Sequence, residues 1–225
     1  MARVIGDVPL TREKSAEMRI VEAGGMRAVM KDYSRRSRLN RLLWAPLLIR
    51  REAQALADLA GIEGVPRLYA QVDRLALVVE YIDGTPCNRL REGDLDAAFF
   101  GALEATLAEV HARGRVHGDL KAASNVIRRP DGRPCLIDFA TSFRKAAWWH
   151  LVHNRLFRSV KRLDRAGIAK LKETRAPHLM TDHDVWLRTA RSLPERLMSR
   201  VRRLYRRLRK PKWRPGFGPD ACDDA

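Results

Sequence analysis

The chain has 225 residues, 45% of them hydrophobic, and its 44 Lys and Arg against 27 Asp and Glu give a formal net charge of +17. This apolar share suffices for a buried core and excludes a wholly disordered chain, and no apolar run reaches the roughly 18–20 residues that a membrane-spanning helix needs. The N-terminus lacks the apolar core of a signal peptide, and Cys87, Cys135 and Cys222 match neither a disulfide framework nor a metal spacing. We therefore expect a cytoplasmic protein.

The positive charge is concentrated in the C-terminal part of the chain. Residues 141–225 carry a net charge of +14, whereas residues 1–140 carry +3. Such a field attracts polyanions, so the candidate partners are a lipid or lipopolysaccharide surface, RNA, and an acidic protein. A solvated basic face with no partner is the alternative.

A β-hairpin and a helix are the first predicted elements. Residues 18–23 and 26–31 alternate between apolar and polar side chains and are joined by two glycines, a pattern typical of a hairpin. Helical spacing over residues 42–60 predicts a helix whose regular part begins near Pro46. Two more strands are expected soon after this helix, over residues 65–71 and 75–82.

A second helix and two short strands follow. Asp94 is the predicted N-cap of a helix over residues 95–112. Short apolar strands are expected within residues 116–128 and 134–139, separated by a Pro-Asp-Gly turn. The rest of the chain is helical in character to about Arg209. This order predicts an α+β fold with a two-lobed plan.

The strongest motif is Val116-His117-Gly118-Asp119-Leu120-Lys121, followed by Asn125-Val126-Ile127 and by Leu136-Ile137-Asp138-Phe139-Ala140. Together these segments resemble the catalytic loop and the metal-binding motif of the protein-kinase-like superfamily. The resemblance implies that Asp119 is the catalytic carboxylate and that Lys121 points toward the transferred phosphate. It also implies that Asn125 and Asp138 bind Mg²⁺, a cation that prefers oxygen ligands. His117 would brace the loop.

Matching nucleotide-binding positions occur in the N-terminal half. Residues 28–31 (Ala-Val-Met-Lys) resemble the strand that carries the phosphate-anchoring lysine. Period-two alternation places Val29 over the adenine and Lys31 on the α- and β-phosphates of ATP. Glu52 matches the helix glutamate that pairs with this lysine. A solvent-facing charge is the alternative for Glu52, but the apolar stripe beside it favours the pair.

Residues 78–84 resemble the hinge between the two kinase lobes. Val79 would guard the back pocket, the backbone of Glu80 and Ile82 would bind adenine, and Asp83 would contact the ribose. A plain strand and turn would look similar. The place of this segment, between the helix glutamate and the catalytic loop, supports the hinge.

The resemblance covers residues 18–140, with departures. There is no glycine-rich phosphate lid, Asn125 lies six residues after Asp119 where five are usual, and the motifs read His-Gly-Asp and Asp-Phe-Ala. Such traits resemble compact atypical kinases, namely lipopolysaccharide-core heptose and Kdo kinases, RIO-type kinases, and the small kinase-like partner in tRNA threonylcarbamoyladenosine synthesis.

The expected architecture is a bilobal α+β kinase-like fold in three segments. A small β-rich N-lobe occupies residues 1–82, a reduced helical C-lobe residues 83–190, and a basic amphipathic tail residues 191–225. Leucines and arginines over residues 193–209 predict an amphipathic helix with a cationic face. Its leucine stripe either packs on the core or meets a membrane or another polyanion. Trp148-Trp149 are expected in the core, with a role as interfacial anchors as the alternative.

The resulting hypothesis is an ATP- and Mg²⁺-dependent kinase that transfers the γ-phosphate to a hydroxyl group. Lys121, two residues after Asp119, favours a serine or threonine hydroxyl of a protein, whereas the basic tail favours lipopolysaccharide or another glycolipid and peripheral contact with the inner membrane. Two alternatives stay open: an RNA-associated kinase-like ATPase, and a pseudokinase scaffold that binds no nucleotide.

Overall fold

The computed structural model describes residues 3–8, 16–23 and 25–189. The chain divides into two compact units, residues 1–190 and 191–225. The second unit, with the helix predicted over residues 193–209, lies outside the described residues. Among the described helices, none is both long enough and apolar enough to cross a membrane.

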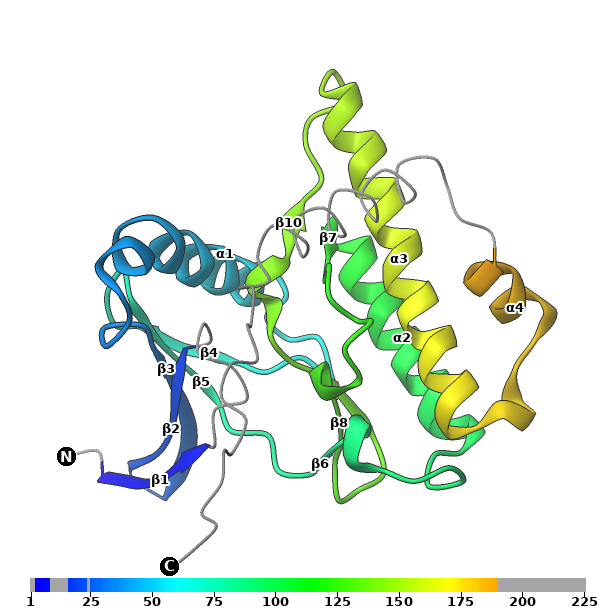
Figure 1. Cartoon of the computed structure of the whole chain (residues 1–225), viewed down its shortest axis with the longest axis horizontal. Helices are drawn as coiled ribbons and strands as arrows, with labels where there is room; N and C mark the ends of the chain where they lie inside the picture. The colour runs from blue at the N-terminus through cyan, green and yellow to red at the C-terminus, as the bar shows by residue number, and fades with distance from the viewer. Residues whose placement is uncertain (1–2, 9–15, 24, 190–225) are drawn as a thin grey trace, which may run out of the picture. The chain divides into compact units, whose positions relative to one another are not determined.

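A five-stranded antiparallel sheet with the order β1-β2-β3-β5-β4 forms the N-terminal part (Figure 1). Its strands are β1 (Arg3–Val8), β2 (Glu17–Ala23), β3 (Met26–Asp32), β4 (Leu68–Gln71) and β5 (Ala76–Glu80). The predicted hairpin is confirmed as β2–β3, in a register that sets Ile20 opposite Val29. Sequence analysis did not predict β1, which adds an edge strand beside β2.

The helix of this part is α1 (Ala45–Asp58), which follows the π-helical turn η1 (Asn40–Trp44). Pro46 lies in the first turn of α1, where its missing N–H leaves no helix hydrogen bond unmade, so the predicted start of the helix is confirmed. The buried face of α1 includes Ile49, Leu56 and also Glu52. A carboxylate on the buried face requires a partner inside the protein.

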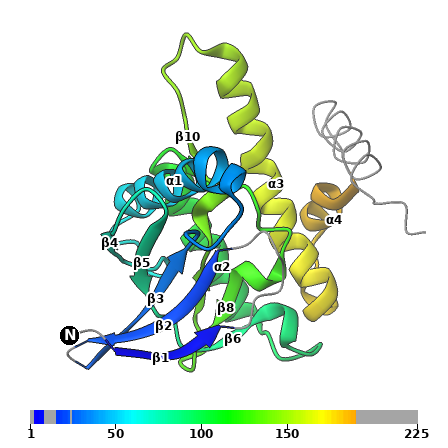
Figure 2. The same ribbon diagram turned by 60° about the vertical axis from the view of Figure 1, so that its left-hand side comes forward.

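The C-terminal part is mainly helical. Its elements are β6 (Thr85–Pro86), η2 (Cys87–Arg89), α2 (Ala97–Ala112), β7 (Arg115–Val116), η3 (Ala123–Asn125), β8 (Val126–Arg128), β9 (Pro134–Leu136), η4 (Phe139–Thr141), β10 (Phe143–Arg144), α3 (Leu151–Arg175), η5 (Pro177–Leu179) and α4 (Asp182–Thr189). The long helices α2 and α3 lie side by side (Figures 1 and 2). The expected bilobal α+β plan is confirmed.

Three local predictions were wrong. Trp148 and Trp149 were expected in the core, but their side chains are 79% and 62% exposed, because they lie in the loop between β10 and α3. The N-cap of α2 is Asp96, whose carboxylate accepts a hydrogen bond from the Phe99 amide at 2.8 Å. Asp94 instead closes the preceding turn, and the burial of Leu95 fixes the chain between the two aspartates. Residues 143–150 are not helical, because β10 pairs with β7 and draws this segment into an extended path.

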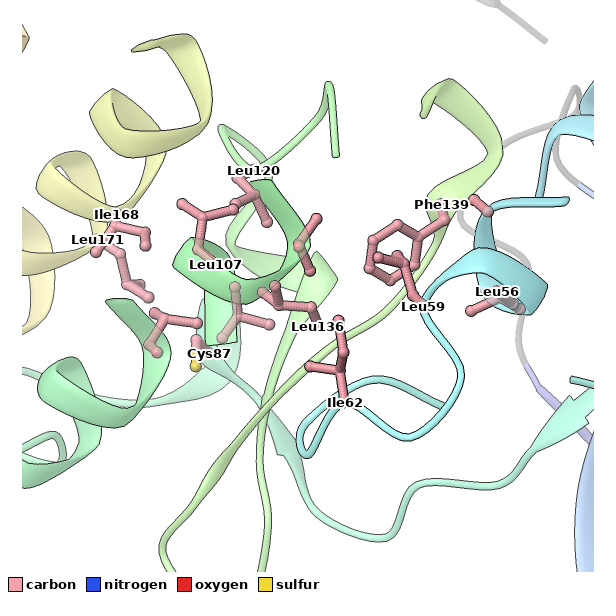
Figure 3. Packing of buried hydrophobic residues seen from close by; sticks show 14 of the residues in the cluster. Leu56, Leu59, Ile62, Cys87, Leu107, Leu120, Leu136, Phe139, Ile168 and Leu171 are labelled. Atoms are coloured by element: carbon pink, nitrogen blue, oxygen red, sulfur yellow. The ribbon is translucent and has the colours of Figure 1, made fainter. Parts of the chain in front are cut away.

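One hydrophobic core connects the two parts of the fold. Figure 3 shows Leu56 and Leu59 close to Phe139, with Leu136 linking them to Leu107. The same cluster continues to α3. Because helix, strand and turn share one close-packed core, the segments that carry the kinase-like motifs are held at fixed positions relative to each other.

Candidate active site

Three charged side chains from distant segments meet at one point. The Lys31 ammonium on β3 lies 2.5 Å from Glu52 Oε1 on α1 and 3.4 Å from Asp138 Oδ1, which follows β9. The side chains of Lys31 and Glu52 are almost fully buried, whereas that of Asp138 is 47% exposed. The cluster therefore has one accessible side, which presents a carboxylate and an ammonium group.

The electrostatics of this cluster keep Lys31 charged. Burial by itself lowers the pKa of Lys31, but the carboxylates of Glu52 and Asp138 outweigh it and leave the pKa above its usual value. Lys31 in turn holds the pKa of Asp138 below its ordinary range, against the effect of burial. Burial raises the pKa of Glu52, and Lys31 opposes that rise only in part. The accessible carboxylate is thus the more acidic of the two.

Asp138 is held in a strained backbone conformation. Its φ of 67° lies in the left-handed region, the only such value for a non-glycine residue in the described ranges. The Ala140 amide donates to the Asp138 carboxylate, and the Phe139 amide donates to the carboxylate of Glu52. Phe139 is fully buried, with its ring centroid 4.6 Å from that of His117. These contacts offset the strain, which is a common feature of functional sites.

His117 connects the loop of residues 117–125, which we predict to be the catalytic loop, to the strand that precedes Asp138. Its Nε2 lies 2.9 Å from the Ile137 carbonyl, which can only accept, so Nε2 carries the proton and Nδ1 accepts from the Asp119 amide at 3.4 Å. Burial lowers the pKa of His117, offset in part by Asp164 and other neighbouring carboxylates. The ring therefore acts as a neutral brace between the loop and the strand.

Asn125 lies against the backbone of Asp119. Its Nδ2 donates to the Asp119 carbonyl at 3.0 Å and lies 3.5 Å from Asp119 Oδ2. The extra residue in this loop is taken up by the 3₁₀ turn η3, so the asparagine still stands directly before β8. The Asn125 carbonyl also accepts from the Ile137 amide, next to Asp138. Lys121 is exposed on the same loop, and its carbonyl accepts from Lys170 Nζ at 3.2 Å.

Sequence analysis missed Asp164, a buried residue of α3 that holds the catalytic loop. One of its oxygens accepts from the His117 amide at 2.8 Å and the other from the Gly118 amide at 2.9 Å. His111 Nε2 lies 3.2 Å from the first of these oxygens. The signal was present in the sequence, because Val160, Asp164 and Ile168 follow one another at helical spacing, which puts an acid on the apolar stripe of the helix.

Two glycines allow the loop to lie close to its neighbours, Gly118 against η4 and Gly167 on α3 against the loop. Gly118 has a φ of 86°, and a Cβ there would lie 2.9 Å from the Thr141 carbonyl oxygen. A Cβ on Gly167 would lie 2.7 Å from the backbone of Leu120. The His-Gly-Asp sequence therefore has a steric reason: residue 118 adopts a conformation that L side chains rarely accept.

The sheet presents a row of apolar side chains beside the charged cluster. Val29 pairs with Ile20 on one side and with Val79 on the other, so the three lie in one row on the face that carries Lys31. Ile20 was not among the predicted site residues. Ile20 could have been predicted from the alternation of apolar and polar residues in β2, which places Ile20 in register with Val29.

The predicted hinge residues lie at the end of β5. The Glu80 amide donates to the Arg67 carbonyl at 2.9 Å, and the Glu80 carboxylate accepts from the Arg67 amide at 3.0 Å. Asp83 is mainly exposed, 4.0 Å from the guanidinium of Arg27, which shares the face of β3 with Lys31. A cavity of about 360 Å³ borders Glu80 and Ile82 but is not lined by Lys31, so it is separate from the charged cluster.

The donor set fits Mg²⁺ held together with phosphates. No group of three or more His, Cys, Asp or Glu that could hold a metal ion occurs in the described part of the chain. Asp138 and Asn125 provide one carboxylate and one amide oxygen. Mg²⁺ is commonly bound by one or two carboxylates with substrate phosphates and water, whereas a protein cage would need more ligands.

Comparison with known proteins identifies related sequences and folds. The sequence profile of the RIO domain matches residues 19–166. Over 98 residues the chain is 33% identical to serine/threonine-protein kinase D of Synechocystis sp., a match that covers 41% of this chain and 19% of that protein. The chain thus spans about a fifth of the length of this curated relative.

Two solved structures share the fold. The Rio2 kinase from Chaetomium thermophilum matches with a TM-score of 0.59 and 17% identity over 80% of this chain and 60% of its own. The ADP/Mg²⁺-phosphoaspartate complex of that Rio2 kinase matches with a TM-score of 0.58 and 18% identity over 80% of this chain and 58% of its own. At these identities the similarity supports the fold, and the chain spans less than two thirds of either protein.

Proposed function

The chain belongs to the RIO domain family, and from this membership we propose that it is a kinase that transfers the γ-phosphate of ATP to a hydroxyl group with the help of Mg²⁺. The observation that carries the proposal is the meeting of Lys31, Glu52 and Asp138 beside the loop of Asp119. Phosphoryl transfer depends mainly on positioning and on cations over the phosphates, and this cluster supplies both.

Each charged group then has a role in binding the nucleotide. Lys31, kept protonated by its two carboxylate neighbours, contacts the α- and β-phosphates, and Glu52 fixes the position of its ammonium group. Asp138 and Asn125 would hold Mg²⁺, which when bound neutralises phosphate charge. The low pKa of Asp138 favours this role, because a metal ligand must be ionised.

The chemical step falls to Asp119. Its carboxylate accepts the proton of the acceptor hydroxyl as the hydroxyl oxygen forms a bond to the γ-phosphorus. The bond between the γ-phosphorus and the bridging oxygen breaks, and ADP leaves. Lys121, on the same loop, balances negative charge on the transferred group. His117 and Asn125 hold the backbone of Asp119 in place.

The base of ATP is placed on the apolar row. Val29 and Ile20 offer an apolar surface to adenine, the buried Val79 guards the back pocket, and the backbone of Glu80 and Ile82 supplies hydrogen bonds at the edge of the adenine. The Glu80 amide already donates a hydrogen bond to the Arg67 carbonyl, so the Glu80 carbonyl is the backbone group that accepts a hydrogen bond from adenine. Asp83, exposed beside the hinge, contacts the ribose.

The proposed acceptor is a serine or threonine hydroxyl of a protein. Lys121 two residues after Asp119 is the arrangement of serine/threonine kinases, and the Synechocystis relative carries that name. A sugar hydroxyl of the lipopolysaccharide core is the second candidate. It is favoured by the net charge of +14 that the sequence carries over residues 141–225, which would attract an anionic glycolipid.

The test is transfer of radiolabelled γ-phosphate by the purified chain to generic protein substrates and, in parallel, to lipopolysaccharide. The expected product is a phosphate ester that resists hydroxylamine, and Asp138→Ala and Asp119→Ala are each expected to reduce its formation by at least about a hundredfold. Asp131→Ala, in an exposed turn, is the matched control. Full transfer by Asp138→Ala would refute the metal assignment.

An ATPase that proceeds through an aspartyl phosphate is the alternative, as the phosphoaspartate of the Rio2 complex suggests. It differs in its product, because an acyl phosphate on the chain itself is cleaved by hydroxylamine. Labelling of the chain that disappears with hydroxylamine, with no labelled acceptor, would support the ATPase. No stabilisation by millimolar Mg-ATP in a thermal shift assay would instead support a scaffold that binds no nucleotide.

A further inference from the structure

An apolar tip projects from the C-terminal part of the fold. It consists of Trp148, Trp149, Leu151, Val152 and Leu156, at the end of the loop after β10 and in the first turns of α3. In both views this segment extends beyond the neighbouring α1 and α2 (Figures 1 and 2). Its five side chains are between 41% and 86% exposed. Exposed apolar side chains gathered in one segment mark an interaction surface.

The tip is held in place from below. His153 Nε2 lies 2.7 Å from the Arg144 carbonyl, and Asn154 Nδ2 donates to the Ala147 carbonyl at 2.9 Å. At its base, the Phe143 ring packs edge-on against the ring of Phe157. The exposure of the tryptophans therefore belongs to an ordered segment, so docking requires little further ordering of the chain.

The sequence around the apolar tip is rich in cations. Between Asp138 and Asp164 the sequence has six Lys and Arg and no Asp or Glu. A cavity of about 370 Å³ directly below the tip is lined by Arg113, Arg144 and Lys145 together with Trp148. Arg113 is fixed there by a hydrogen bond to the Asp58 carbonyl. We refer to this cavity as the cationic pocket.

More positive charge flanks the apolar side chains on α3. Arg155 lies three and four positions after Val152 and Leu151, and Arg158 lies on the next turn, so both stand beside the apolar face. Both are exposed. A surface with tryptophans, aliphatic side chains and a border of arginines has the composition of elements that lie in the membrane interface.

We propose that the apolar tip and the cationic pocket form a docking site for an anionic phospholipid surface. Trp148 and Trp149 enter the headgroup layer, and Leu151 and Val152 reach the boundary of the acyl chains. The pocket then faces the lipid phosphates, whose negative charge complements its three cations. This site lies in a different part of the fold from the Lys31 cluster, so lipid docking is independent of the proposed phosphoryl transfer.

Charge and side-chain type argue against three other occupants of the site. The chain's own C-terminal segment, with its leucines and many arginines, would bring positive charge against positive charge, and a second copy of the tip would do the same. Single-stranded RNA would satisfy the cations and stack on tryptophan, but it makes no use of exposed Leu151 and Val152. An anionic lipid surface uses all three kinds of side chain.

The experiment is flotation of the full chain with vesicles of phosphatidylcholine, with and without added phosphatidylglycerol. The chain is expected to float with the anionic vesicles, and to retain part of its binding at about 0.5 M salt, where charge attraction is screened. The double variant Trp149→Ser/Val152→Ser is expected to reduce the remaining binding by at least about tenfold. Trp186→Ser, which removes a half-exposed tryptophan from α4, is the matched control and is expected to bind as the original chain does.

A second variant tests the charges. Lys145→Glu/Arg155→Glu is expected to weaken binding to anionic vesicles at low salt by at least about tenfold. Quenching by brominated lipids, lost in Trp148→Phe/Trp149→Phe, would place these rings in the membrane. Equal stabilisation by Mg-ATP in every variant would show that the fold and the nucleotide site are intact, which separates this result from the test of the kinase.

Unchanged flotation of Trp149→Ser/Val152→Ser at high salt would overturn the proposal. So would equal binding to vesicles with and without phosphatidylglycerol. Tryptophan fluorescence also distinguishes lipid from RNA. If a single-stranded oligonucleotide quenches the fluorescence of Trp148 and Trp149 while brominated anionic vesicles do not, the tip is a nucleic-acid site and the lipid proposal is wrong.

Discussion

Substitution of Asp164 by asparagine tests how the catalytic loop is held. The carboxylate is buried and receives the amides of His117 and Gly118 on different oxygens, with His111 as a third neighbour. Asparagine has the same shape but only one oxygen. One of the two backbone amides must therefore face an NH₂ group, which cannot accept a hydrogen bond.

The expected loss of stability follows from the less damaging of the two orientations of the asparagine side-chain amide. If the NH₂ group replaces the oxygen that faces Gly118, the bonds to His117 and His111 survive without the charge, and one charge-assisted bond worth about 1.5–3 kcal/mol is lost. The unpaired Gly118 amide and the weakened remaining bonds add to this. We expect Asp164→Asn to lower the free energy of unfolding by about 2–4 kcal/mol, a fall in Tm of roughly 5–10 °C for a chain of this size.

The assay is urea unfolding followed by circular dichroism, with phosphoryl transfer measured on the same samples. Asp182→Asn, on the surface of α4, is the control and should change stability by less than about 0.5 kcal/mol. Transfer should fall more than stability alone explains, because the loop moves while the protein stays folded. A change below about 0.5 kcal/mol for Asp164→Asn, with normal transfer, would refute the proposed role.

Three further predictions concern Glu52, Cys87 and Gly118. Glu52→Gln should lower the free energy of unfolding by about 3 kcal/mol. The raised pKa of Lys31 adds stability that is lost only as the pH rises through that pKa, so alkaline unfolding of this variant, followed by circular dichroism, should begin at lower pH than in the original chain. Alkaline unfolding at an unchanged pH would contradict the ion pair. Burial raises the pKa of Cys87 to about 12, so mass spectrometry should find it unalkylated by iodoacetamide at neutral pH until urea is added; labelling of the native protein would count against its burial. In thermal unfolding, Gly118→Ala should destabilise the chain by about 1–2 kcal/mol more than Gly132→Ala. Both glycines have positive φ, but only at residue 118 would the added Cβ lie within 3 Å of a backbone atom. Equal effects of the two substitutions would show that the loop shifts to make room for the Cβ.

The hairpin and the shared face of Val29 and Lys31 were accessible to sequence reasoning because both are local. Alternation over residues 18–31 fixes which side chains share a face, and this places Val29 with Lys31 before any contact is known. The N-cap of α2 was missed for the opposite reason. Asp94 and Asp96 are equally good caps by composition, and the burial of Leu95 between them, a tertiary effect, decided where the helix begins.

The exposed tryptophans were also beyond sequence reasoning. Trp148 and Trp149 resemble core residues by composition, and only the pairing of β10 with β7 shows that the loop leaves the core and turns at its far end. The same pairing removed the helix expected over residues 143–150. Strand pairing between distant segments depends on which edges meet, and no pattern within one segment records this.

By itself the sequence determined the chemistry available to this protein: an ammonium, three carboxylates and an amide, in an order and spacing that match one superfamily. The tertiary structure decided which of these groups act together, because hydrogen bonds and ion pairs require atoms within a few ångströms. It brought Lys31 and Asp138 to 3.4 Å across 107 residues, and it gave the catalytic loop an anchor in Asp164. Folding one shared apolar core imposes those distances, and neighbours along the chain carry no information about them.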